Sequence, residues 1–166
     1  MKKEYFWVSL LVITVIGCIG IAKITNMSDG LQRETDEPEK IPNQENEDSK
    51  MQISIIGNGN TIIFELNNDQ AATDLYEQLP LTIKVEDFSN NEKIFYPPKK
   101  LNTANTPLAN AQFGTLAYYA PWGDVVMFYE SFGTASGLYE LGKVISGGEY
   151  IKNLSGMIEI NKVVTG

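Results

Sequence analysis

The sequence predicts a mainly β domain over residues 51–166, folded as a closed eight-stranded barrel with one or two short helices. Three observations support this prediction. From residue 51 the chain divides into roughly eight short apolar or alternating runs, which are typical of strands. Glycine, asparagine and proline separate these runs at short intervals. So many strands in so short a length favour closure, because a barrel removes the exposed edges that antiparallel sheets must otherwise protect.

The first two runs predict a β-hairpin. Residues 53–55 and 62–66 carry alternating apolar side chains, and Asn58-Gly59 lies at the centre of the polar segment between them. An Asn-Gly pair suits the positive backbone angles of a tight reverse turn. No helix follows these glycines to present its N-terminus to a ligand, so we interpret them as turn residues rather than as a phosphate-binding loop.

A helix is expected over residues 69–78, where alanine, leucine and tyrosine recur at helical spacing. Asn68 or Asp69 is suited to cap its N-terminus, because a short polar side chain can accept a hydrogen bond from the first turn. Pro80 ends the pattern. The prediction is therefore one short helix between the hairpin and the rest of the barrel.

The second half of the domain predicts further strands joined by loops. Residues 97–112 are rich in Asn, Thr, Ala, Lys and Pro, which predicts a long loop that serves as a lid or rim or simply as a surface connection. The other elements expected are strands over 81–86 and 94–96, two paired strands within 116–129, a strand over 138–145, a helical turn near 149–153 and a final strand over 157–164.

The start of the chain has the pattern of an export signal. Two lysines precede an apolar run over residues 5–16, and the sequence Val15-Ile16-Gly17-Cys18 resembles the lipobox of bacterial lipoproteins. The resemblance implies cleavage before Cys18, the single cysteine of the chain, and lipidation of its sulfur. An uncleaved helical anchor is the alternative, because the apolar character continues beyond the cysteine. Either interpretation makes residues 1–25 a signal or membrane anchor, with the domain on the extracytoplasmic side of the cell membrane.

Residues 26–50 predict an acidic disordered linker. They hold eight acidic and three basic residues, two prolines and hardly any aliphatic side chains, so they cannot bury enough apolar surface to fold. The domain that follows contains seven lysines, twelve acids and no arginine, within a chain of net charge −8. Such a domain has little with which to neutralise a phosphate backbone, which argues against nucleic acid as a partner.

Several segments resemble the bacterial cyclophilin-like domain family. The longest is Leu116-Ala117-Tyr118-Tyr119-Ala120-Pro121-Trp122-Gly123-Asp124, and it is accompanied by residues 79–83, 86–88, 128–129 and 137–143. The resemblance implies an eight-stranded barrel with helices at its ends. The members are mostly uncharacterised, so it implies a fold rather than an activity.

The residue content argues against catalysis. Cyclophilins that isomerise prolyl bonds use an arginine beside an aromatic groove, whereas this domain has neither arginine nor histidine. A lysine such as Lys93 offers charge but not the planar fork of donors. Paired acids such as Glu86 with Asp87, or Asp124 with Glu130, are candidates for acid-base chemistry, although acids at strand ends are usually solvated. We therefore expect no catalytic residue, no metal and no cofactor, with a divergent peptidyl-prolyl isomerase as the alternative.

Binding is the function that remains. Alternation sends about half of the domain's aromatic side chains into the core, and the rest are free to form an apolar groove for a peptide or small molecule, with acids as polar anchors. Trp122, in a Pro-Trp-Gly turn, is the strongest single candidate. The predicted ligand-binding residues are Glu86, Phe95, Tyr118, Trp122, Asp124 and Phe128.

Overall fold

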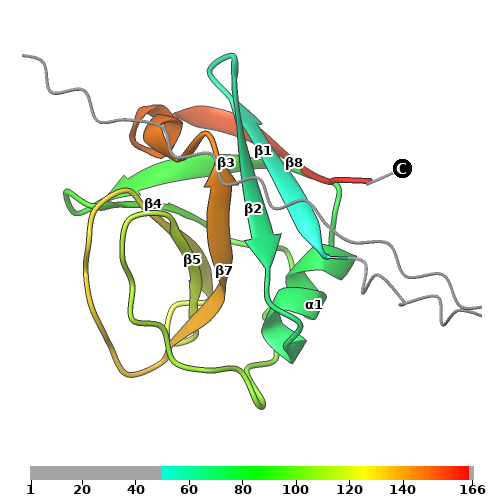
Figure 1. The fold of residues 1–166 in the computed structure, drawn as a ribbon, viewed down its shortest axis with the longest axis vertical. Coiled ribbons are helices and arrows are strands. Elements are labelled where there is room, and N and C mark those ends of the chain that lie inside the picture. The colour runs from blue at the N-terminus through cyan, green and yellow to red at the C-terminus, as the bar shows by residue number, and fades with distance from the viewer. Residues whose placement is uncertain (1–49, 165–166) are drawn as a thin grey trace, which may run out of the picture. The chain divides into compact units, whose positions relative to one another are not determined.

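A computed structural model describes residues 50–164 as one antiparallel β-barrel (Figure 1). Neighbouring strands follow the order β1-β2-β7-β5-β6-β4-β3-β8, and β8 pairs with β1 to close the barrel. The prediction of a mainly β, closed eight-stranded barrel is confirmed. The strands are β1 Gln52–Gly57, β2 Asn60–Leu66, β3 Leu81–Phe88, β4 Glu92–Phe95, β5 Thr115–Tyr119, β6 Asp124–Phe128, β7 Leu138–Ser146 and β8 Gly156–Lys162.

The predicted signal or anchor and all but the last residue of the predicted linker lie outside the described residues, as does Cys18. Between residues 50 and 164, no helix combines the length and the apolar composition that crossing a bilayer requires. The ends of the predicted elements within this range differ from the observed ones by at most two residues.

The first hairpin forms as the sequence predicts. Strands β1 and β2 pair from Gln52 opposite Glu65 to Gly57 opposite Asn60. Asn58 and Gly59, the two turn residues, have φ angles of 52° and 76°. Both lie in the left-handed region that a two-residue hairpin turn requires, which explains why asparagine and glycine stand there.

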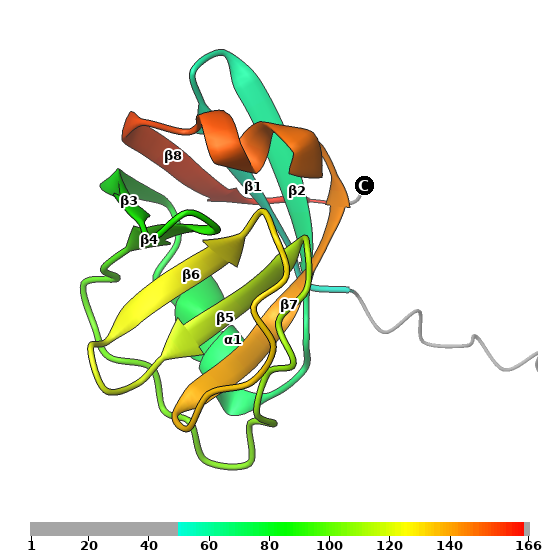
Figure 2. The same ribbon diagram turned by 90° about the vertical axis from the view of Figure 1, so that its left-hand side faces the viewer.

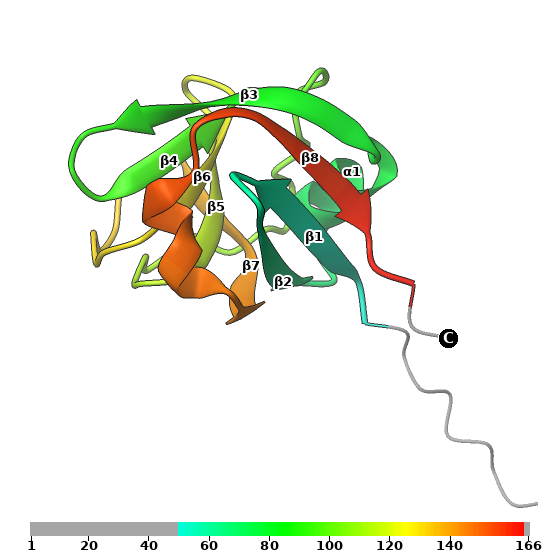
Figure 3. The same cartoon turned by 90° about the horizontal axis from the view of Figure 1, so that it is seen from above.

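Two short helices lie at opposite ends of the barrel (Figures 1 and 3). Helix α1, Gln70–Glu77, begins after Asp69, whose side chain accepts a hydrogen bond from the Ala72 N–H. Its buried face, which includes Leu75, packs into the main hydrophobic core. The 3-10 helix η1, Gly148–Asn153, contributes Ile151 to the same core. The helices therefore cover the two open ends that a barrel leaves exposed.

Strands β4, β5 and β6 are buried on both faces. Their inward side chains join the main core, which we call the barrel core. Apolar side chains on their outer face join residues of the neighbouring loops and of β7 in a second group, the outer cluster. It consists of Ile94, Ala109, Ala111, Ala117, Val126, Phe128 and Leu138. Segments that include residues 108–111 and 129–137 run outside the barrel beside these strands and cover part of this face (Figure 2). The outer cluster positions the candidate site.

Candidate functional site

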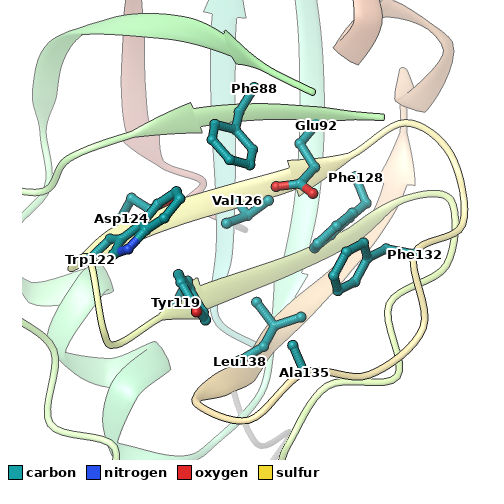
Figure 4. Close-up of a pocket in the computed structure, with 10 residues that line it drawn as sticks. All are labelled: Phe88, Glu92, Tyr119, Trp122, Asp124, Val126, Phe128, Phe132, Ala135 and Leu138. Atoms are coloured by element: carbon teal, nitrogen blue, oxygen red, sulfur yellow. The ribbon is translucent and has the colours of Figure 1, made fainter. Parts of the chain in front are cut away.

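A pocket of about 170 Å³ opens on the outer face of β4, β5 and β6, next to the outer cluster (Figure 4). Its lining is mainly apolar, with two acidic side chains among aromatic and aliphatic ones. None of the lining residues is cationic. They are Phe88, Glu92, Tyr119, Trp122, Asp124, Val126, Phe128, Phe132, Ala135 and Leu138.

Strand alternation explains which side chains of β6 reach the pocket. Asp124, Val126 and Phe128 point outward, whereas Val125 and Met127 point into the barrel core. The register then brings residues of the neighbouring strands beside them, because Glu92 of β4 lies opposite Phe128. Phe88 of β3 lies opposite Glu92, and Tyr119 of β5 lies opposite Asp124. Four consecutive strands therefore build the floor and one wall.

Aromatic rings form the walls of the pocket. The Trp122 ring meets the rings of Phe88 and Tyr119 edge to face, with centroids 5.2 Å and 5.4 Å away. On the opposite side, Phe128 stacks on Phe132 at 5.5 Å. Trp122 is 53% exposed and Phe132 is 49% exposed, so both rings remain open to a ligand. Pairs of this geometry stabilise one another beyond the area they bury, which keeps the walls in place.

A tight turn between β5 and β6 holds Trp122 in position. The backbone N–H groups of Trp122 and Gly123 both donate to the Tyr119 carbonyl, at 3.2 Å and 2.8 Å. Gly123 has a φ of 77°, a conformation that L side chains rarely adopt. The Pro-Trp-Gly sequence therefore sets the direction in which the tryptophan leaves the sheet.

Two carboxylates are buried in the pocket without a counter-charge. Glu92 is 7% exposed and Asp124 is 2% exposed. The Asp124 Oδ1 atom has no hydrogen-bond partner, and neither side chain enters an ion pair within the part of the chain that the structure describes. Buried acids are usually paired, because burial disfavours the charged form. These two carboxylates are therefore buried acids of the site that lack a cationic partner among the described residues.

Burial changes the protonation of both acids. Loss of hydration raises the pKa of Glu92 to about 7, and the negative charge of Asp124 adds to the rise. Burial also raises the pKa of Asp124, although a hydrogen bond with its own backbone opposes the change. The ionisation of Glu92 is therefore moved from the acidic range toward neutral pH.

The two acids lie toward opposite ends of the pocket. Asp124 and Phe128 are four residues apart on β6, which corresponds to about 13 Å along a strand. Because Glu92 pairs with Phe128, its backbone lies at the far end from Asp124, and Val126 lies between them (Figure 4). Across residues 50–164, no group of three His, Cys, Asp or Glu side chains is placed to hold a metal ion.

The model of the cyclophilin-like family matches residues 55–162, which span all but the ends of the barrel. This chain belongs to the cyclophilin-like family. The solution structure of a hypothetical protein from Archaeoglobus fulgidus is similar to it, with a TM-score of 0.54 and 15% sequence identity, over 69% of this chain and 95% of that one. At this identity the similarity shows the fold alone. No curated protein matches the chain.

Three of the predicted site residues of this cyclophilin-like domain line the pocket, namely Trp122, Asp124 and Phe128. Their role in ligand binding stays a prediction. The other three lie outside the pocket. Phe95 and Tyr118 are fully buried in the barrel core. Glu86 is exposed on β3, and its carboxylate is 2.9 Å from the Lys84 ammonium.

Seven residues that line the pocket were not among the predicted site residues: Phe88, Glu92, Tyr119, Val126, Phe132, Ala135 and Leu138. Tyr119 and Phe88 fall in segments that carry the resemblance to the cyclophilin-like family, which was the available signal for them. Glu92 follows a polar turn and has the sequence context of a solvated residue. Its burial depends on pairing with β6, which no local pattern encodes.

Proposed function

We propose that this cyclophilin-like domain is a binding module that takes a peptide or small molecule in the outer-face pocket and does not catalyse a reaction. The observation that carries the proposal is the half-exposed state of Trp122 and Phe132 in the walls of a concave apolar site. Large aromatic side chains that stay uncovered around a pocket are typical of ligand sites. The two acids supply polar groups that can orient a ligand.

The lining of the pocket argues against the alternative, a divergent peptidyl-prolyl isomerase. The arginine of catalytic cyclophilins supplies a cationic donor beside the aromatic groove, and no cationic residue lines this pocket. Lys93 alternates with Glu92 along β4 and points to the other face of the sheet, where it pairs with Asp87. A protease-coupled assay with proline peptides is therefore expected to show no acceleration, and rates near those of cyclophilins would support the isomerase instead.

We further propose that residues 1–25 hold the domain at the extracytoplasmic face of the membrane. The support is the lipobox resemblance and the apolar run before Cys18. Labelled fatty acid is expected to join the full chain and to be lost in Cys18→Ser. Label that persists in this variant, or a chain that remains in the cytosol, would contradict lipidation at this cysteine.

Binding can be measured through the tryptophan in the pocket wall. The chain has two tryptophans, so Trp7→Phe in the full chain leaves Trp122 as the single tryptophan, which is excited selectively over tyrosine. Titration with proline-containing peptides is expected to shift its emission in a saturable way. Phe132→Ala is expected to weaken the response, whereas Met157→Ala, a change at an exposed side chain of β8, leaves it unchanged. If the emission of both variants responds equally to the peptide, the peptide binds outside the pocket.

A further inference from the structure

The charge of the pocket indicates the chemistry of its ligand. From this charge and its aromatic walls we infer that the pocket takes a small organic ammonium ion, an inference that rests on the binding function proposed above. Two carboxylates, Glu92 and Asp124, face a pocket with no cationic lining residue. An anionic ligand would meet uncompensated negative charge, whereas a cation supplies the missing counter-charge.

The unpaired oxygen of Asp124 distinguishes a cation from a neutral apolar ligand. This atom is buried and has no hydrogen-bond partner within the described residues. A neutral apolar ligand would remove any remaining water from the site and leave the carboxylate unpaired, which is costly. An ammonium group in the pocket places an opposite charge near this carboxylate, which offsets the cost of its burial.

The aromatic walls favour the same ligand. The faces and edges of Trp122, Tyr119 and Phe88 surround the end of the pocket that holds Asp124 (Figure 4). A cation near an aromatic face is attracted by the ring quadrupole, and tryptophan gives the strongest interaction. The combination of aromatic rings with a nearby carboxylate is the usual chemistry by which proteins hold alkylated ammonium groups.

Size and spacing limit the ligand further. The pocket measures about 170 Å³, and apolar cavities of about 150 Å³ hold a benzene ring, so a ligand of about six to eight non-hydrogen atoms fits. A small metal ion is disfavoured because the two acids approach from opposite ends, with the apolar side chain of Val126 between them. An alkylammonium ion covers this apolar floor while its charge stays near a carboxylate.

The test compares two ligands of the same shape that differ in charge. Choline and its neutral carbon analogue, 3,3-dimethylbutan-1-ol, are titrated into the full-length protein by isothermal calorimetry at pH 8. We expect choline to bind at least tenfold more tightly. Asp124→Asn, which keeps the shape of the side chain, is expected to remove most of this preference without weakening the neutral alcohol. Glu86→Gln, a change at an exposed acid outside the pocket, is expected to leave the preference intact.

Equal binding of the two ligands, or an unchanged preference in Asp124→Asn, overturns the inference while the proposed binding function stands. If choline and butylamine both fail to bind, the inference also fails, and the fluorescence titration with peptides then decides the proposed function separately. Butylamine and Nα-acetyl-lysine methylamide distinguish the source of the ammonium group. If the two compounds bind with comparable affinity, the natural ligand is a lysine side chain of a larger molecule. If butylamine binds more tightly, the natural ligand is a free amine.

Discussion

The two faces of strands β4, β5 and β6 differ in how completely their side chains are satisfied. On the inner face, Phe95, Tyr118 and Met127 are fully buried in the barrel core. On the outer face, Glu92 and Asp124 are buried without a counter-charge beside rings that remain half exposed. The same strands therefore hold the barrel together with one face and shape a pocket with the other. Buried acids without a counter-charge reduce stability, and such a cost on one face of a sheet is typical of a functional site.

The largest difference in stability between the two faces is expected when a core side chain is truncated. Phe95→Ala removes a fully buried ring from the barrel core and is expected to lower the free energy of unfolding by about 3–5 kcal/mol. Urea denaturation monitored by circular dichroism measures this change. Phe132→Ala is the matched control, because the same side chain is removed from the half-exposed wall of the pocket, and its cost is expected to stay below about 1.5 kcal/mol. Similar losses in the two variants would show that the outer face is as tightly packed as the barrel core.

A smaller change in stability, this time an increase, is expected from a substitution of Glu92 on the outer face. The pKa of Glu92 is raised to about 7 in the folded protein, compared with 4.5 for the unperturbed group. Well below pH 4.5 the side chain is protonated in both the folded and the unfolded state. As pH rises toward 7, the unfolded state loses this proton first, so the contribution of Glu92 to stability is lost.

Glu92→Gln removes this penalty. It is expected to raise the free energy of unfolding by about 1–2 kcal/mol at pH 8, less than the full shift implies because the open pocket admits water. At pH 4 the variant and the parent are expected to agree. Urea denaturation at both pH values measures the difference, with Glu86→Gln as an exposed, ion-paired control that changes little at either pH. A gain that is the same at pH 4 and pH 8 would exclude ionisation of Glu92 as its cause.

The barrel was predictable from the sequence because its signals are local. The turn at Asn58-Gly59, the cap at Asp69 and the alternation in β1 and β2 each depend on a few neighbouring residues. The closed strand order was accessible only through the number of strands and the family resemblance, since pairings such as β1 with β8 join segments far apart in the chain.

The pocket was only partly predictable, because most of β5 and β6 is apolar on both faces and β4 is only four residues long. In such strands the sequence does not show whether the odd or the even positions face inward. Tyr118 was therefore predicted to bind ligand, whereas its neighbour Tyr119 lines the pocket. Phe95 was assigned to the site for the same reason. Glu86 and Glu92 look alike as acids near a polar turn, and only the pairing of β4 with β6 and the covering loop bury the second.

The smallest effect on stability is expected at the residue that matters most for the proposed function. Trp122 is half exposed, and its ring packs edge to face on Phe88 and Tyr119. Trp122→Ala is therefore expected to lower the free energy of unfolding by only about 0.5–1 kcal/mol. The same change is expected to abolish choline binding in the calorimetric titration. If Trp122→Ala instead destabilises the protein as much as Phe95→Ala does, the ring is part of the fold. In that case the separation between a structural inner face and a functional outer face does not hold.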